Sequence, residues 1–394
     1  MSSPSRRPAR LRAATGAVFL VAGLGIGAWA ACLPSLKRAF ALSDAELGLA
    51  LFGFAAGAML TMPFVGRVVM RLGSAPLSIA AAGGFALFLG LAPQAPDLLW
   101  LTVVVAAAGA CFGTLDVAMN THATLVERAW GRMIMSSFHA LFSIGNLAGA
   151  GLAGFVLAHG LEAAQGLPIA AAVIAAILLA AAPGLGLGRA AAAPEEEPAT
   201  PARRRFALPG RPLLVLGGLA FLSFLAEGAI TDWSAVYAAT VVGTAESTAA
   251  LAYGVFATTM TLGRVVGDRI AGRIGAIATV RGGAALVALS LVLALAVPST
   301  VPMLVAFALA GFGIANLIPV LFAVAGRTGG GRPGINVSTV AAMGYAGMLL
   351  GPPLIGLVAE AAGLRTGLGV VVLAVVVVGL GAGRLAAEPE QTAS

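Results

Sequence analysis

Ionisable and polar residues stand at helical spacing inside long apolar stretches of this sequence. One such set is separated by four, four and three positions: Ser223, Glu227, Thr231 and Ser234. Residues so spaced share one face of a helix. A carboxyl buried among apolar groups can take up and release a proton near neutral pH. Glu227 is therefore the first candidate for handling protons, and a hydrogen-bonded ladder around a protonated Glu227 is the structural alternative.

A second polar set contains a histidine. Its members are separated by three, four and three positions: Ser136, His139, Ser143 and Asn146. An unperturbed histidine titrates near pH 6.5, so His139 could carry a proton itself or bridge to Asp116 or Asn120. A histidine with a purely structural hydrogen bond is the alternative.

Asp116 and Asn120 share a helical face in the stretch before the histidine, since they are four positions apart. An ion pair of Asp116 with Arg128 or Arg132 is the alternative to a proton-coupling role. Three more residues are expected to line a solute cavity unless they only pack: Trp29, Asn316 and Tyr345. Pro319 should loosen the helix next to Asn316.

The composition decides what kind of protein positions these residues. Of the 394 residues, 59% are hydrophobic and 10% are charged, whereas an ordinary soluble domain is about 25% charged. The chain is therefore expected to be an all-α polytopic membrane protein with the lipid bilayer as its main partner. The net charge of +7 is scattered over short polar segments, so no nucleic-acid partner is expected.

Apolar stretches of roughly 20 residues predict the membrane spans. Twelve are predicted: 14–33, 47–65, 76–93, 98–119, 135–158, 167–187, 213–237, 249–266, 277–297, 301–325, 337–359 and 366–386.

The positive charges predict the orientation. With both termini in the cytoplasm, the outer loops hold only Lys37, Arg38 and Arg365, and the cytoplasmic segments hold the other 20 of the 23 Lys and Arg residues. This asymmetry is typical of membrane proteins. We expect a multi-pass protein of a bacterial inner membrane, with an uncleaved first helix and both termini in the cytoplasm.

The chain also predicts an internal repeat. When the sequence is shifted against itself so that Gly145 and Gly149 meet Gly347 and Gly351, each predicted span falls onto the span six later. The hydrophilic segment 188–212 then divides two six-helix halves, 1–187 and 213–394, and its Pro, Ala and charge content is typical of a linker.

The two stretches GRVVMRLG and GRVVGDRIAGRIG stand at corresponding places in the two halves. They resemble the cytoplasmic gating loops of the major facilitator superfamily, although the acids expected there are replaced. The candidate gating residues are Gly66, Arg71, Gly73, Asp268, Arg273 and Gly275. Three more stretches resemble a little-characterised bacterial branch: SSFHALFSIG, EGAITDW and GYAGMLLGPPLIG. The resemblance implies twelve helices in two parallel six-helix repeats, with a solute site between the halves.

These observations together predict a secondary transporter that works by alternating access, coupled to protons and active as a monomer. Uptake of a small polar, sugar-like solute is favoured by the hydroxyl and amide groups expected in the cavity, and because 135–158 lacks the proline of drug antiporters. No arginine is expected in the cavity, which argues against a strongly anionic solute. Proton-coupled efflux of amphipathic compounds is the alternative. A non-transporting sensor and an intramembrane enzyme are lesser ones. No enzyme activity, cofactor or metal is expected.

Overall fold

The structure, a computed structural model, describes residues 6–131, 134–186, 210–328 and 333–385. This part of the chain is helical throughout its regular structure and contains no strand. Twelve of its helical segments are long and apolar enough to cross a membrane. The prediction of an all-α polytopic membrane protein with twelve spans is confirmed.

The helices follow one another in the sequence, and the longest segment between two of them separates α6 from α7. Their bounds are α1 (Arg6–Ala39), α2 (Asp44–Leu72), α3 (Ser74–Leu91), α4 (Leu98–Trp130), α5 (Met135–Ala158), α6 (Ala163–Ala181), α7 (Arg211–Thr240), α8 (Glu246–Ala296), α9 (Thr300–Ile314), α10 (Leu317–Arg327), α11 (Pro333–Ala362) and α12 (Leu364–Gly381). The long helix α8 contains the eighth and ninth spans, and α9 and α10 together form the tenth.

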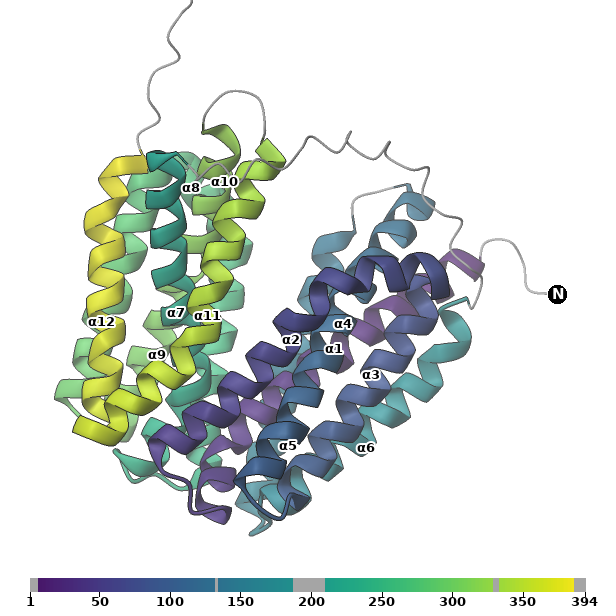
Figure 1. Cartoon of the computed structure of the whole chain (residues 1–394), viewed down its shortest axis with the longest axis horizontal. Helices are drawn as coiled ribbons and strands as arrows, with labels where there is room; N and C mark the ends of the chain where they lie inside the picture. Colours follow the sequence, from purple (N-terminus) through teal and green to yellow (C-terminus); the bar gives the residue numbers. More distant parts are fainter. Residues whose placement is uncertain (1–5, 132–133, 187–209, 329–332, 386–394) are drawn as a thin grey trace, which may run out of the picture. The chain divides into compact units, whose positions relative to one another are not determined.

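The chain separates into two compact units. The first consists of Met1–Arg205 with Ala245–Gly254, and the second of Phe206–Thr244 with Val255–Ser394. Figure 1 colours the helices of the first unit from purple to blue and those of the second from teal to yellow. The first two turns of α8 thus belong to the first unit. Residues 188–209 of the predicted linker lie outside the described residues.

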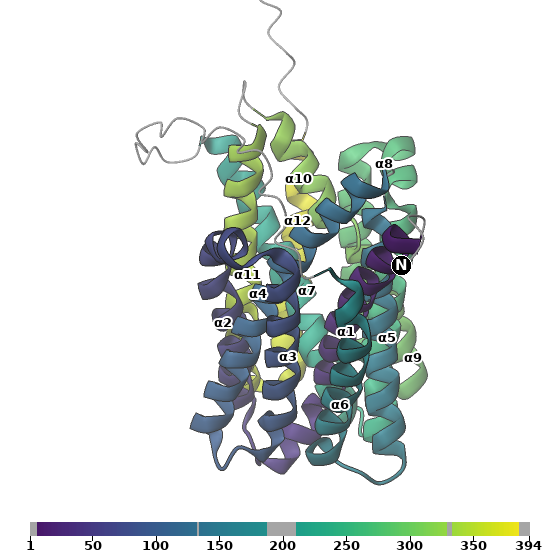
Figure 2. The same cartoon turned by 90° about the vertical axis from the view of Figure 1, so that its right-hand side faces the viewer.

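In the first unit α1 packs against α5 and α6, while α4 packs against α2 and α3. Figure 2 faces this unit and shows the two groups of helices side by side. In the second unit α11 and α12 both pack against α7. These contacts put α1 and α7 at corresponding positions in their units.

Glycine allows α1 and α5 to touch backbone to backbone. A Cβ atom added at Gly145 would overlap the carbonyl oxygen of Leu20, and one added at Gly149 would overlap that of Leu24. Small residues that let helices approach this closely are the usual means of helix association in lipid. The crossing of α1 and α5 therefore tolerates no side chain at these two glycines.

One close helix contact recurs in both units at the predicted shift. A Cβ atom added at Gly109 would overlap the carbonyl oxygen of Phe54, and one added at Gly311 would overlap that of Phe256. The shift that places Gly145 on Gly347 carries both members of the first pair onto those of the second. It also carries the first residue of α2 onto the first residue of α8. The predicted repeat is therefore confirmed, residue by residue, at this helix crossing.

The expected gating loops are almost entirely helical. Residues 66–72 form the last two turns of α2, and Gly73 alone separates α2 from α3. Its φ of 90° and ψ of 152° are matched by Gly275, with φ 82° and ψ 165°, inside α8. Placing these stretches in loops was wrong, because the helices continue beyond the apolar core until a glycine turns the chain.

Replacing Gly275 by Ala is expected to lower the stability of the second unit by about 1–3 kcal/mol, since this backbone conformation is available essentially only to glycine. A Cβ atom at Gly275 would meet no other atom within 4 Å, so the effect is one of backbone strain alone. Thermal unfolding of the purified protein in detergent measures it.

The matched control is Gly272→Ala. Gly272 is exposed within the helix and its added Cβ also meets nothing within 4 Å. We expect it to melt at or slightly above the wild-type temperature, since helical glycine is less stable than alanine. Equal melting temperatures for the two variants would refute the assignment of strain to Gly275.

The end of the fourth span differs from the prediction. Helix α4 continues past the predicted end at residue 119 and stops only at Trp130. The polar residues of this extension have tertiary partners: the ring of His122 hydrogen-bonds with the hydroxyl of Ser74, and the Glu127 carboxylate accepts the backbone N–H groups of Ile134 and Met135. The prediction from hydropathy ended the span too early, because it treats polar residues as exposed to water and takes no account of their hydrogen-bond partners within the protein.

The tenth span is broken, as predicted from its proline. Helix α9 ends at Ile314, and α10 begins at Leu317 after a residue, Asn316, with φ −111° and ψ 1°. Pro319 lacks an N–H and its ring clashes with the carbonyl four residues earlier. The break therefore has a local cause that is visible in the sequence.

Candidate functional site

The carboxyl of Glu227 lies near the middle of the 30-residue helix α7 and is buried in the second unit. One of its oxygens, Oε1, lies 3.0 Å from Nη2 of Arg264 on α8. The other oxygen, Oε2, is buried and has no hydrogen-bond partner among the described residues. Glu227 is thus half paired, and its second oxygen is open to a proton or to a donor from a ligand.

Arg264 does not lie in a cytoplasmic segment, so that part of the sequence prediction is wrong. The residue lies within the span Glu246–Gly267 and reaches the buried carboxyl of Glu227. The apolar stretch 249–266 already contained it, so a signal was available. An anionic solute was disfavoured because no arginine was expected in the cavity, and the position of Arg264 removes that reason.

The other polar residues on this face of α7 differ in burial and in hydrogen bonding. Ser223 and Ser234 are fully buried, and Thr231 is partly buried. The hydroxyl of Ser223 donates to the carbonyl oxygen of Leu219 one turn earlier, at 2.8 Å. The hydroxyl of Ser234 has no partner among the described residues. The four residues share one face of α7 as predicted, and Glu227 is the ionisable residue on that face.

Aromatic rings lie one turn from Glu227. Phe224 contacts Tyr345 of α11 with ring centroids 5.0 Å apart and Phe322 of α10 with centroids 6.2 Å apart. Tyr345 is 40% exposed. The flat faces of these rings offer a surface on which a ring of a solute can stack. Tyr345 was expected from the sequence, whereas Phe224 and Phe322 were not singled out.

Asn316 binds the helix that carries Arg264. Its amide donates to the carbonyl oxygen of Gly263 at 3.0 Å, and it packs so closely on α8 that Gly267 has no room for a side chain. The break between α9 and α10 therefore holds α8 at the position of the arginine. Asn316 thus contacts α8 at the residue next to Arg264, and the cavity-lining role expected from the sequence stays a prediction.

Asp116 of the first unit accepts hydrogen bonds within its own helix. The amide of Asn120 donates to the Asp116 carboxylate at 3.2 Å and to its backbone oxygen at 2.8 Å. Among the described residues no ion pair of Asp116 with Arg128 is formed, and Arg132 lies outside them. Asp116 and Asn120, one turn apart on α4, thus form a hydrogen-bonded pair.

Trp29 is buried in a cluster of rings within the first unit. It stacks on Phe54 at a centroid distance of 6.3 Å, and Phe54 in turn contacts Phe85 and Phe112. Phe112 stands one turn before Asp116 on α4. The packing alternative describes Trp29 better than an open cavity wall.

The polar residues on one face of α5 contact different partners. The exposed ring of His139 packs edge-on against Phe19 of α1 at 5.4 Å, and the hydroxyl of Ser143 donates to the His139 carbonyl oxygen. Asn146 is buried and accepts a hydrogen bond from the Tyr253 hydroxyl at 2.8 Å. The side chain of Ser136 lies outside the described residues.

The gating candidates on the turns at Gly73 and Gly275 are mostly exposed. Gly66 lies within α2 and its added Cβ would meet nothing within 4 Å. Arg71 and Arg273 are exposed at the last helical turns before the two glycines. The side chain of Asp268 lies outside the described residues, so its gating role stays a prediction.

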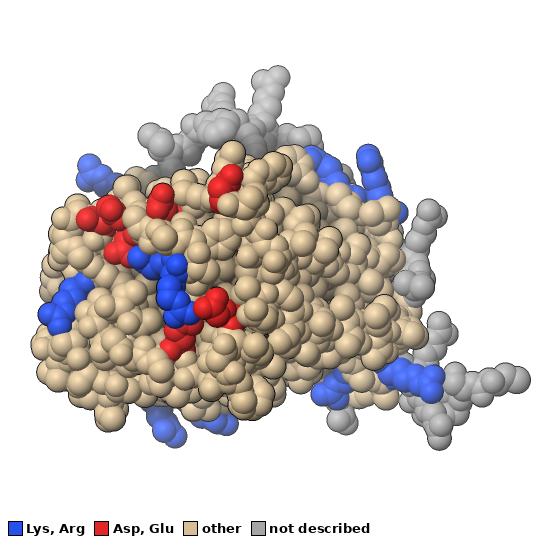
Figure 3. Space-filling view, turned by 90° about the horizontal axis from the view of Figure 1, so that it is seen from below, with Lys and Arg blue, Asp and Glu red and all other residues tan. Residues whose placement is uncertain are grey.

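An ion cluster that sequence reasoning missed joins three helices of the first unit. Arg38 at the end of α1 pairs with Glu246 at the start of α8 and lies 3.4 Å from Glu162, which precedes α6. The N–H of Ala163 donates to Ser35 at 2.9 Å beside it. Figure 3, a view from below, shows acidic and basic side chains gathered on one part of the surface and surrounded by uncharged residues. Among the described residues no three His, Cys, Asp or Glu side chains converge as metal ligands.

The sequence as a whole matches a known family. The sequence model of the Major Facilitator Superfamily matches residues 15–328. The chain belongs to the Major Facilitator Superfamily. An uncharacterized transporter of this type from Yersinia pestis is 36% identical over 359 residues, or 91% of each chain. Membrane protein MosC of Rhizobium meliloti is 33% identical over 88% of this chain and 83% of its own.

Solved structures of other superfamily transporters share the fold. The nucleoside transporter NupG matches with a TM-score of 0.79 at 16% identity, covering 95% of this chain and 98% of its own. A bacterial homologue of the iron transporter ferroportin, in an inward-facing state, matches with a TM-score of 0.74 at 15% identity, over 98% and 100% of the two chains. At this level of identity the likeness concerns the fold and leaves the substrate of this superfamily transporter open.

Proposed function

We propose that this superfamily transporter couples movement of a small polar solute to protons through Glu227. The half-paired carboxyl in the middle of α7 supports the proposal: Oε1 is held by Arg264, and the buried Oε2 has no partner among the described residues. An ionisable group inside a membrane helix is expensive and is usually retained for function.

The pair also suggests how coupling operates. A proton added to Oε2 neutralises Glu227 and weakens the attraction that holds Arg264. Loss of the proton restores the ion pair. Opposite charge stabilises the ionised carboxyl, so protonation of Glu227 and pairing with Arg264 oppose each other. A solute that donates a hydrogen bond to Glu227 is then bound differently in the two protonation states.

The surroundings of Glu227 favour an uncharged solute with hydroxyl or amide groups and a flat ring. The ion pair carries no net charge, and Phe224 stands one turn before Glu227 with its ring against that of Tyr345. Sugars fit the polar groups, and the shared fold of a nucleoside transporter makes nucleosides a second class to test. Uptake is favoured, with efflux of amphipathic compounds as the second candidate, because the exposed ring of Tyr345 also suits such compounds.

The proposal also covers the orientation, membrane location and oligomeric state of the protein. The excess of Lys and Arg on one set of segments supports a cytoplasmic position for both termini. Homologues from bacteria support an inner-membrane location. We propose that the transporter acts as a monomer.

Transport by the purified protein in sealed proteoliposomes tests this function. With an outside-acid pH gradient, we expect at least one sugar or nucleoside of a panel to accumulate above its external concentration. A protonophore should abolish the accumulation, and protein-free liposomes are the control. A solute that stabilises the protein but never crosses the bilayer would indicate a sensor, and accumulation that survives the protonophore would exclude proton coupling.

A further inference from the structure

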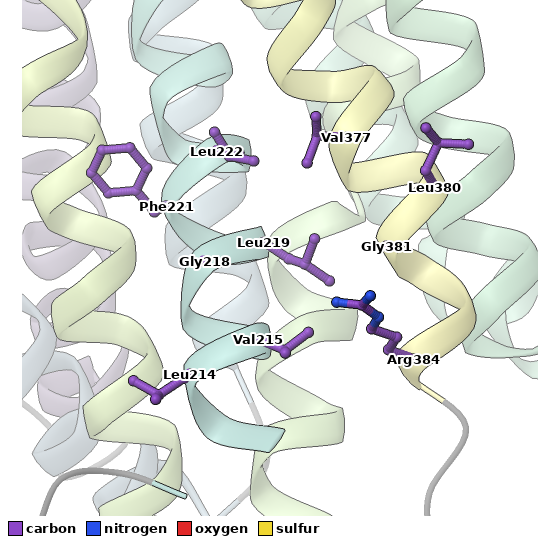
Figure 4. A pocket seen from close by; sticks show the side chains of 10 residues that line it. All are labelled: Leu214, Val215, Gly218, Leu219, Phe221, Leu222, Val377, Leu380, Gly381 and Arg384. Atoms are coloured by element: carbon purple, nitrogen blue, oxygen red, sulfur yellow. The ribbon is translucent and has the colours of Figure 1, made fainter. Parts of the chain in front are cut away.

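An apolar groove runs between α7 and α12 of the second unit, separate from the Glu227–Arg264 pair. Its volume is about 570 Å³, within the range of ligand sites. Figure 4 shows its two walls, formed by one face of α7 and the last turns of α12. The walls are lined by Leu214, Val215, Gly218, Leu219, Phe221, Leu222, Val377, Leu380 and Gly381, with Arg384 at the end.

The groove is open along its length. Leu380 is 77% exposed, Val377 is 51% exposed and Leu214 is 43% exposed. On a membrane helix such side chains meet lipid acyl chains. The α7 wall runs from Leu214 to Leu222, which is about 12 Å at the helical rise of about 1.5 Å per residue. An extended hydrocarbon chain fits such a slot better than the polar tail Ala386–Ser394 that follows it in the sequence.

One end of the groove is positively charged. Arg384 is the only charged residue among those that line it, and its guanidinium points toward α7 beside Leu219 from the short 3-10 helix Ala382–Leu385 that follows α12 (Figure 4). The guanidinium of Arg281 lies near Gly383, the residue before Arg384, since a Cβ atom added at Gly383 would come within 2.8 Å of its Nη2 atom, but Arg281 is not among the residues that line the groove. The lining residues include no acid. A negatively charged group would therefore meet an opposite charge at this end of the groove and nowhere else along it.

We propose that this groove binds one anionic phospholipid, with an acyl chain between α7 and α12 and the phosphate at Arg384. Basic pockets between transmembrane helices are suited to anionic head groups. In the proposed orientation the basic end faces the cytoplasm, so the lipid comes from the inner leaflet. Because α7 also carries Glu227, the lipid would brace the helix on which the transport site is built.

Native mass spectrometry of the full-length protein, titrated with lipid in detergent, tests the proposal. The probes are dioleoyl phosphatidylglycerol, dioleoyl phosphatidylcholine with the same chains, and glycerol 3-phosphate, which has the phosphate but no chains. We expect phosphatidylglycerol to bind about fivefold more tightly than phosphatidylcholine, the effect of roughly one arginine near an anionic lipid. Glycerol 3-phosphate should not compete at equal concentration.

Two variants separate the head-group contact from the chain contact. Arg384→Gln should abolish the preference for phosphatidylglycerol, whereas Arg269→Gln, an exposed arginine of α8 that does not line the groove, should keep it. Gly218→Leu should weaken binding of both lipids by filling the slot, since its added Cβ meets no atom within 4 Å. Gly369→Leu on α12 has the same free space away from the groove and should change neither.

Three results would overturn the lipid site. Equal affinity of wild type for the two lipids would mean that the basic end does not select the head group. A preference that survives Arg384→Gln would place the anion elsewhere. Competition by glycerol 3-phosphate would indicate a site for a soluble anion in place of a lipid.

Discussion

Glu227→Gln is expected to abolish accumulation driven by a pH gradient while leaving facilitated exchange of the same solute in place. Glutamine has the shape of glutamate and can still accept a hydrogen bond from Arg264 at the 3.0 Å distance now occupied by Oε1. It cannot take up a proton. The solute should therefore reach equal concentrations on the two sides of the bilayer and go no further. Proteoliposome uptake with an imposed gradient, followed by counterflow, measures both properties.

Two other acids provide the comparison. Glu360→Gln changes an exposed acid of the same unit and should leave accumulation at the wild-type level. Asp116→Asn changes the candidate of the first unit, whose carboxylate accepts from Asn120. If Glu227→Gln and Asp116→Asn both accumulate solute like the wild type, the assignment of coupling to these carboxyls is wrong.

Gly149→Leu is expected to prevent correct folding of the first unit. The first side-chain atom would overlap the carbonyl oxygen of Leu24 and come within 2.9 Å of the backbone nitrogen of Ala28. Relief requires that α1 and α5 move apart, because the obstacle is backbone and cannot change rotamer. We expect a loss of more than about 3 kcal/mol, the upper end of the usual range for overpacked cores. Size-exclusion chromatography and thermal unfolding in detergent report the outcome.

The neighbouring glycine supplies a matched control. Gly151 lies two positions later on the same helix, is exposed, and its added Cβ would meet no atom within 4 Å. Gly151→Leu should therefore fold and melt like the wild type. Similar behaviour of the two variants would contradict the backbone contact between α1 and α5.

Several features of the fold followed from the sequence because they depend on neighbours along the chain. Twelve apolar stretches predicted twelve spans, since the length of a membrane helix is set by the bilayer. Pro319 predicted the break that separates α9 from α10. The constant shift between the two halves predicted the shared contacts of Gly109 and Gly311, because a repeated sequence repeats its packing.

The candidate site was predicted only in part. Glu227 and Tyr345 were found from spacing and residue type, and both lie in the same region of the second unit as Phe224. The partners of the polar residues were not found. Arg264 was placed in a segment at the membrane surface, and Tyr253 was not connected with Asn146, although the two side chains are hydrogen-bonded.

The sequence by itself determined that this protein crosses a membrane twelve times, that it is built from a repeat, and that a few polar residues stand inside its spans. These are properties of composition, period and local spacing, which a chain carries before it folds. Only the tertiary structure decided that Glu227 is held by Arg264, that Asn316 supports the arginine's helix, and that α7 and α12 form a groove ending at Arg384. Those contacts depend on which helix faces meet and at what height, and this is set by the packing of residues far apart in the sequence.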